Sequence, residues 1–297
     1  MSSTQRSDRH PLNPLEPLIE GIESNEALDQ PAKLVSDKVG EILKPGTLKD
    51  LISGTQIGHA LHPMLTDVVI GSFTSATALD LIGGDSDGRA AERLIALGIA
   101  AYPPTALTGV SDWADSEYGN DSVRRIGLVH AATNGAALAL YAASLAARRR
   151  GSRGKGVFLG LLGAGALGAG GYLGGHLTFA KGIGADQTIF DPGPTEWTDA
   201  TGADELTAGE AKRVVVDDTP VLLFSQGDKT FAIHDRCSHR GCSLADGEIE
   251  DGVVTCPCHG SRFGLENGSL KKGPATQPQP AFKTRERDGR IEIRLAT

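Results

Sequence analysis

Two short stretches, CSHRGC at residues 237–242 and CPCHGS at residues 256–261, decide the fold of the C-terminal third of this 297-residue chain. They supply two thiols and two imidazoles in the spacings C-x-H and C-x-x-H. The chain has four cysteines, and all four lie in these two stretches. Because thiolates and neutral imidazoles are ligands of transition metals, the pattern predicts a metal centre built from two loops.

The mixed donor set suits a [2Fe–2S] cluster in which two Cys hold one iron and two His hold the other. Imidazole is neutral where thiolate is anionic, so such a cluster is reduced more easily than one held by four Cys. Tetrahedral zinc is an alternative for a Cys/His set, although C-x-H brings two ligands unusually close for a structural zinc site. A disulfide framework without metal is a further alternative, but it leaves His239 and His259 without a role.

Together with the tripeptide GPA at residues 273–275, the two stretches resemble the Rieske family. Within that family they are similar to the subgroup with an extra disulfide, which occurs in quinol-oxidising cytochrome complexes. The resemblance implies that one [2Fe–2S] cluster is held by four ligands, and that the two remaining cysteines form a disulfide between the loops. The implied ligands are Cys237, His239, Cys256 and His259, and the implied disulfide joins Cys242 and Cys258.

The resemblance also implies roles for residues around the cluster. The hydroxyl of Ser261 is expected to bond a bridging sulfide, and Gly273 and Pro274 belong to a loop that covers the cluster. Phe263 stands where the quinol-oxidising subgroup has a Tyr that donates to a ligand sulfur, and Arg240 stands where it has an apolar residue. The donor lost at Phe263 lowers the reduction potential, and Arg240 adds positive charge and polarity beside the exposed His. Together these two differences count against direct quinol oxidation.

The middle of the chain contains long runs with few or no charged residues. Each is long enough to cross a hydrocarbon core of about 30 Å as a helix. We therefore expect four transmembrane helices; a buried soluble bundle, or a flexible Gly-rich linker over residues 160–175, are the alternatives. The runs are residues 62–84, 94–111, 126–147 and 156–180.

The segment HALHPMLTDVVIG at residues 59–71 resembles the opening motif of an uncharacterised family of small four-helix bacterial membrane proteins. The tetrapeptide GGHL at residues 174–177 fits the same family. This resemblance implies architecture and says little about chemistry.

The expected fold class is mixed, with an all-α four-helix transmembrane bundle followed by an all-β Rieske domain. Residues 1–55 form a polar tail with one short amphipathic helix, which lies on the membrane or caps the Rieske domain, the alternative being a solvated helix in a loose tail. Residues 56–185 form the bundle, and residues 186–196 form a hinge that contains DPGP. Residues 197–297 contain short runs that predict antiparallel strands, separated by turn residues such as Asp251-Gly252. The expected strands are residues 213–216, 221–225, 230–234, 253–256 and 290–294.

We expect an electron-transfer protein without substrate chemistry of its own, because a cluster passes single electrons. Its expected partners are the lipid bilayer and a redox protein or the quinone pool. The net charge of −8 does not indicate a nucleic-acid surface. A subunit of a quinol-oxidising cytochrome complex is the alternative. An oxygenase component is disfavoured, because oxygenases need a separate iron held by two His and a carboxylate, and residues 260–297 contain no His.

Basic residues concentrate in the first and third connections between the expected helices, which places both termini and the Rieske domain on the outer face of a bacterial inner membrane. The triplet Arg148–Arg150 also resembles a twin-arginine export signal. In this topology His62, His130 and His176 share the membrane face that carries the Rieske domain. We expect them to line a haem or quinone pocket beneath the cluster, the alternative being interfacial histidines bonded to water and headgroups.

Overall fold

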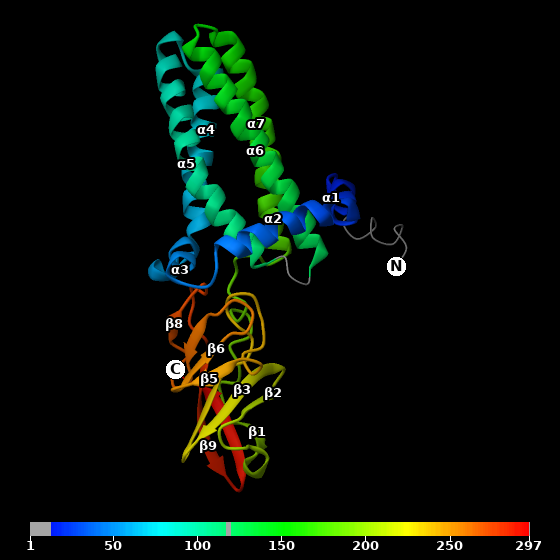
Figure 1. The fold of residues 1–297 in the computed structure, drawn as a ribbon, viewed down its shortest axis with the longest axis vertical. Coiled ribbons are helices and arrows are strands. Elements are labelled where there is room, and N and C mark those ends of the chain that lie inside the picture. The colour runs from blue at the N-terminus through cyan, green and yellow to red at the C-terminus, as the bar shows by residue number, and fades with distance from the viewer. Residues whose placement is uncertain (1–12, 117–119, 297) are drawn as a thin grey trace. The chain divides into compact units, whose positions relative to one another are not determined.

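In the computed structural model, which describes residues 13–116 and 120–296, the chain folds into two compact units. One comprises Met1–Ile42 and Leu61–Ile183, and the other comprises Leu43–Ala60 and Gly184–Thr297. The first unit is helical and the second contains the β-structure (Figure 1). The predicted fold class is thereby confirmed. The first twelve residues of the expected polar tail lie outside the described part of the chain.

The helical unit is built from four long helices, in which α4 packs along α5 and α6 packs along α7 (Figure 1). All four are long and apolar enough to cross a membrane, and only 22 to 33 % of the residues in their most apolar windows are buried. The exposed remainder needs an apolar surrounding, which lipid supplies. The helices are α4 (Leu61–Ile82), α5 (Gly88–Ala114), α6 (Asp121–Arg149) and α7 (Arg153–Gly175), and the π-helical turn η6 (His176–Ala180) extends the last.

The centre of this bundle is aromatic and closely packed. Phe73 of α4 stacks on Tyr141 of α6 with 3.9 Å between ring centroids. A Cβ at Gly98 of α5 would lie 2.5 Å from the Phe73 ring, and one at Gly163 of α7 would lie 3.0 Å from the Tyr141 ring. The small residues therefore allow the helices to approach the stacked pair.

The segment expected to be one polar tail is divided between the two units. Asp29 at the start of α2 accepts hydrogen bonds from the Arg125 guanidinium of α6 at 2.8 and 2.7 Å, which ties this part to the bundle. Residues 43–60 instead belong to the unit with the β-sheets. The helices of the bundle part are α1 (Glu16–Glu23), η3 (Glu26–Leu28) and α2 (Asp29–Ile42), those of residues 43–60 are α3 (Thr47–Ser53) and η4 (Thr55–Ile57), and η5 (Asp85–Asp87) connects α4 to α5.

The second unit contains two antiparallel sheets in its described part, one of six strands in the order β1-β10-β9-β4-β3-β2 and one of four in the order β5-β6-β7-β8. The first sheet is formed by β1 (Thr198–Gly202), β2 (Ala211–Val216), β3 (Thr219–Gln226), β4 (Lys229–His234), β9 (Ala281–Arg287) and β10 (Arg290–Leu295). The second is formed by β5 (Glu248–Glu250), β6 (Val253–Thr255), β7 (Arg262–Gly264) and β8 (Leu270–Lys272). A short 3₁₀ turn, η7 (Ala203–Glu205), follows β1.

Strand β3 shows how the six-stranded sheet buries both faces. Leu222 and Phe224 join a core that also contains Cys237 and Cys256, whereas Val221 and Leu223 join a second core. This is the two-residue period of a strand with apolar residues on either side. One face of the large sheet therefore supports the loops that carry the cysteines.

The expected hinge at residues 186–196 is packed onto the β unit. Asp191 accepts a hydrogen bond from Thr219, and the amide of Leu295 donates to the Pro194 carbonyl at 2.7 Å. Gly193 has φ +91°, and a Cβ there would lie 2.4 Å from the Phe282 ring. The segment is thus packed as part of the β domain, because Gly193 and Pro194 allow its backbone to lie close to the sheet.

Candidate metal centre

Two loops of the same design carry the predicted ligands, one after β4 and one after β6. In the first, the amide of Cys237 donates to Cys242 O at 2.8 Å and the amide of Gly241 donates to Cys237 O at 2.8 Å. In the second, the amide of Cys256 donates to the Ser261 carbonyl at 2.8 Å, and the amide of Gly260 donates to the Cys256 carbonyl at 3.0 Å. The fifth residue of each loop is a glycine with positive φ, +79° and +76°. Each loop is therefore a closed turn that presents its cysteine in a fixed direction.

Both predicted ligand cysteines are buried and lie against one another. The hydrogen bond between their side chains raises the pKa of Cys237, which burial raises further, and lowers the pKa of Cys256 to about 7. Backbone amides of His239 and Arg240 donate to Cys237, and those of Cys258 and His259 donate to Cys256. Such donors stabilise negative charge on sulfur, as thiolate ligands require.

The two predicted imidazole ligands also converge. The rings of His239 and His259 lie 5.1 Å apart between centroids and meet edge to face at 88°. Burial of His239, and the positive charges of Arg240 and of Lys49 in α3, lower the pKa of its imidazole. A neutral imidazole is the form that binds a metal. Two thiols and two imidazoles on facing loops therefore fit the donor set of a [2Fe–2S] cluster of the two-His type.

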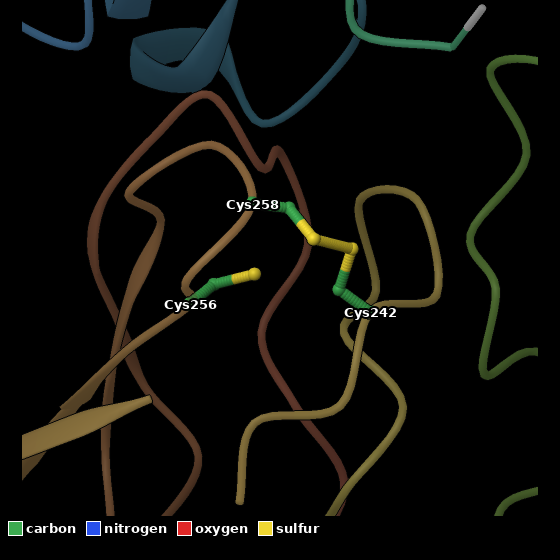
Figure 2. A group of neighbouring side chains, drawn as sticks. All are labelled: Cys242, Cys256 and Cys258. Carbon is green, nitrogen blue, oxygen red and sulfur yellow. A yellow bond between two sulfur atoms is a disulfide. The ribbon is translucent and has the colours of Figure 1, made fainter. Parts of the chain in front are cut away.

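The remaining two cysteines form a disulfide between the loops, Cys242–Cys258, with 6.5 Å between their Cα atoms. Figure 2 shows the side chain of Cys256 directed toward this bond. The three sulfur atoms lie within 4.8 Å of one another. The disulfide joins the two ligand loops beside the predicted metal position.

Three further positions lie in or close to the two loops. The hydroxyl of Ser261 is buried and accepts a hydrogen bond from the Ala275 amide at 3.0 Å, which ties the second loop to the stretch that contains Gly273 and Pro274. The ring of Phe263 is fully buried in the core shared with Cys237. Arg240 donates to His239 O at 3.2 Å.

Gln279 is a supporting residue that the sequence motifs do not reveal. Its side chain accepts from the Ser238 amide at 2.8 Å and donates to the carbonyls of His234 and Arg236 at 2.9 and 2.8 Å. It is 3 % exposed. An amide side chain that satisfies three backbone groups fixes the first loop in place. The sequence signal was weak, because a glutamine after a proline-rich stretch has no distinctive spacing.

In the bundle, the structure places two of the three membrane histidines in similar surroundings. His62 Nδ1 lies 3.0 Å from the Thr105 carbonyl of α5, and His130 Nδ1 lies 2.8 Å from the Gly170 carbonyl of α7. The two rings are close enough to act on one another electrostatically. Since a carbonyl only accepts, Nδ1 carries the proton in each ring and Nε2 carries the lone pair. Asn134 Nδ2 lies 3.4 Å from His130 Nε2.

The third membrane histidine has a different partner. His176 Nε2 lies 3.2 Å from Glu23 Oε1 of α1, and the same oxygen accepts from Lys181 Nζ at 2.6 Å. This contact with α1 accounts for His176 without a cofactor. His62 and His130 thus have matching backbone partners, whereas His176 has a side-chain partner.

Comparison with known proteins agrees with this geometry. The profile of the Rieske [2Fe-2S] domain matches residues 196–283, and DUF2231, described as a predicted membrane protein, matches residues 58–187. The chain is 36% identical over 100 residues to the anthranilate 1,2-dioxygenase ferredoxin subunit of Burkholderia cepacia, which covers 34% of this chain and 93% of that protein. It is 39% identical over 93 residues to the 3-phenylpropionate/cinnamic acid dioxygenase ferredoxin subunit of Escherichia coli (strain K12), covering 31% and 86%.

Among solved structures, the ferredoxin of carbazole 1,9a-dioxygenase from Nocardioides aromaticivorans IC177 is 24% identical, with a TM-score of 0.32, and the match covers 34% of this chain and 98% of that one. The matched relatives correspond to the β unit, and the membrane profile corresponds to the four long helices. The chain thus belongs to the Rieske [2Fe–2S] family, whose electron-transfer domain is joined here to a DUF2231 membrane domain.

Proposed function

We propose that this protein carries single electrons between a membrane donor, a quinol or a cytochrome, and a redox partner. In this proposal Cys237 and Cys256 hold one iron of the cluster, and His239 and His259 hold the other. The observation that carries it is the convergence of two thiols and two imidazoles on twin loops, in a chain with four membrane-length helices. The bound cluster supplies one-electron oxidation and reduction, so no substrate chemistry is required of the protein.

The protein's own residues would set how readily the electron is accepted. The backbone amides that donate to Cys237 and Cys256 stabilise negative charge on sulfur, and the charge of Arg240 favours a neutral imidazole at His239. The Ser261 hydroxyl accepts from the Ala275 amide, which leaves its own proton to donate toward the cluster. These contacts support a potential in the Rieske range of about −150 to +300 mV.

For the membrane domain, we propose that His62 and His130 form a site for a haem or a quinol. With Nδ1 bound to a backbone carbonyl, each ring carries its lone pair on Nε2. The Nε2 of His62 can ligate haem iron or accept a hydrogen bond from a quinol hydroxyl, and the Nε2 of His130 can do so in exchange for its contact with Asn134 Nδ2 at 3.4 Å. A carbonyl that orients an imidazole in this way is a common outer partner of metal-binding histidines. His176 is left out of the site because of its contact with Glu23.

The class of partner has two candidates. Similarity to ferredoxin subunits of dioxygenases favours an oxygenase-type redox protein as the acceptor. The disulfide and the membrane domain favour a quinol-oxidising cytochrome complex instead. In either case we place the Rieske domain on the outer face of the membrane, where an oxidising environment maintains a disulfide.

The intact protein, solubilised in detergent, tests the proposal in one preparation. We expect iron and acid-labile sulfide in equal amounts, and a rhombic EPR signal with an average g below the free-electron value after reduction. Cys237→Ser should abolish this signal, whereas the matched variant Cys242→Ser/Cys258→Ser should retain it in a less stable form. Stoichiometric zinc in place of iron and sulfide would refute the cluster. An optical spectrum without a Soret band would exclude haem at His62 and His130 and leave quinol as the ligand.

A further inference from the structure

Residues 43–60, here called the cap segment, form α3 and η4 and fold onto the loops that surround the proposed cluster. Thr55 Oγ1 donates to the Ala275 carbonyl at 3.1 Å, and Gln277 Nε2 donates to the Gly58 carbonyl at 2.6 Å. Both contacts lie within one compact unit, although more than 200 residues separate the partners in sequence. The cap segment precedes the membrane helices in the chain but is a structural part of the Rieske domain.

The cap segment also packs against the loop that contains Gly273 and Pro274, here called the third loop. This close fit requires a glycine at residue 273, because it has no Cβ. A Cβ at Gly273 would lie 2.1 Å from Thr55 Oγ1 and 2.9 Å from Asp50 Oδ1. Real Cβ atoms do not approach other atoms so closely, so any larger residue would displace the segment. Asp50 is 9 % exposed, and its burial raises the pKa of its carboxyl, against the opposing charge of Lys272.

The other two loops also face the cap segment. Pro45 lies 3.3 Å from the position of a Cβ on Gly260, which directly follows His259. Lys49 is 4 % exposed, and its charge acts on the imidazole of His239. The cap segment therefore contacts or faces all three loops around the proposed cluster.

Helix α3 of the cap segment buries mostly polar side chains. Its buried residues are Lys49, Asp50, Ile52 and Ser53, and Asp50 lies against Gly273 of the cluster loops. The apolar side chains of Leu48, Leu51 and Ile57 point outward and are 58, 58 and 53 % exposed. Each exposed Å² of apolar surface costs roughly 25 cal/mol in water relative to an apolar environment. Three large apolar side chains exposed within residues 48–57 favour an apolar surrounding.

We propose that the cap segment seats the cluster-bearing end of the Rieske domain on the lipid bilayer, with Leu48, Leu51 and Ile57 in its apolar boundary. We assign lipid to this apolar surface because the cap segment leads directly into a membrane-length helix. Helix α4 begins at Leu61, three residues after Gly58. An interfacial helix is held by such a row of apolar side chains. The seating does not depend on which molecule donates the electron.

Spin labels on the full-length protein in phosphatidylcholine–phosphatidylglycerol nanodiscs test the seating. A nitroxide would be placed on Leu48→Cys, Leu51→Cys or Ile57→Cys, with the cluster oxidised. We expect each label to collide more with oxygen, which concentrates in lipid, than with a water-soluble nickel chelate. Val215→Cys on β2 is the matched control, since Val215 is an apolar residue of the same domain and 65 % exposed. Its label should show the opposite preference.

Labels in the cap segment that meet the nickel chelate as freely as the control would overturn the proposal. Labels shielded from both reagents would overturn it too, and would assign the surface to a protein partner. Each variant is accepted only if it retains the cluster EPR signal, so a failed cluster and a failed seating are distinguished. The unmodified protein supplies a second measurement: a photoactivatable phosphatidylcholine should mark residues 47–58, and the absence of label there would also refute the seating.

Discussion

Single residues at the proposed cluster divide into those that offer ligands and those that hold the loops. Gly241 and Gly260 occupy the same place in twin loops and have almost the same φ. That repetition, C-x-x-x-G in both stretches, was visible in the sequence. Gln279 also holds the first loop in its conformation, although it is distant in sequence, because it hydrogen-bonds three backbone groups of that loop and the residues before it. Loop geometry is thus set partly by local conformation and partly by one long-range side chain.

Phe263 offers a test of how the protein sets its potential. Its ring is fully buried beside the cysteines, where a Tyr hydroxyl would be a donor to a ligand sulfur. One such hydrogen bond to the reduced form is worth about 1 kcal/mol, which corresponds to about 40 mV for a one-electron couple. Phe263→Tyr should therefore raise the reduction potential by about this amount in a spectroelectrochemical titration.

The matched control is Phe282→Tyr, the same substitution in the other core of the domain. It should leave the potential unchanged. A fall in potential for Phe263→Tyr, or equal shifts for the two variants, would show that residue 263 does not direct a donor at the cluster.

Among the elements, α7 contains several glycine pairs at the G-x-x-x-G spacing, and their surroundings differ. Gly156, Gly160 and Gly170 are buried, and they lie beside Ser144, Arg148 and Asn134 of α6. Gly171 has no atom within 4 Å of its would-be Cβ. Hence the pair at residues 170 and 174 meets a neighbouring helix, whereas the pair at 171 and 175 does not. The G-x-x-x-G pattern indicates close packing but does not say which of two overlapping pairs provides it.

Helix α1 is attached to the end of α7 by a contact that depends on pH. Burial raises the pKa of the Glu23 carboxyl, but hydrogen bonds from Lys181 and Ser122 and the charge of Lys181 outweigh it, so the pKa lies below its ordinary value of 4.5. A carboxyl with a lowered pKa stabilises the folded contact above its ordinary pKa, and the contribution is lost as pH falls toward the lowered value. The docking of α1 should accordingly weaken below about pH 4.5.

A nitroxide on Leu18→Cys, which is exposed on α1, reports this docking through its mobility. The label should be restricted at pH 7 and become mobile as the sample is acidified. With Glu23→Gln it should be mobile across the whole range, because the charge that pairs with Lys181 is gone. Glu20→Gln, one turn earlier, is the control and should titrate like the parent. A label equally restricted at pH 7 and pH 4 would contradict the role of Glu23.

For the whole molecule, the expected membrane topology follows from the distribution of charge. The α4–α5 and α6–α7 connections, together with the helix ends beside them, carry most of the bundle's arginines, which the positive-inside rule assigns to the cytoplasm. Both termini then face outward. A periplasm-active reporter fused after residue 297 should be active, and a cytoplasm-active reporter at the same place should be silent. Replacing Arg148, Arg149 and Arg150 by Gln should reduce this preference, and activity only of the cytoplasmic reporter would reverse the orientation.

The sequence by itself determined the two ligand stretches, the four membrane-length runs and the mixed fold class, because these depend on local spacing and on hydrophobicity within a continuous segment. It also located turns such as Asp251-Gly252, where both residues adopt positive φ. Strands β1, β5, β7, β8 and β9 were not anticipated. They are short or rich in charge, so pairing with neighbours rather than alternation places them in the sheets.

Only the tertiary structure decided which distant residues meet. It divided the expected tail between two units and packed the DPGP segment onto the β domain. In the bundle, it placed His62 and His130 each against a backbone carbonyl and placed His176 against Glu23. It also placed residues 43–60 against loops near residues 260–277. The physical reason is that such contacts depend on shape complementarity between surfaces far apart in the chain, as at Gly273 and Thr55, and no periodicity of a single segment records it.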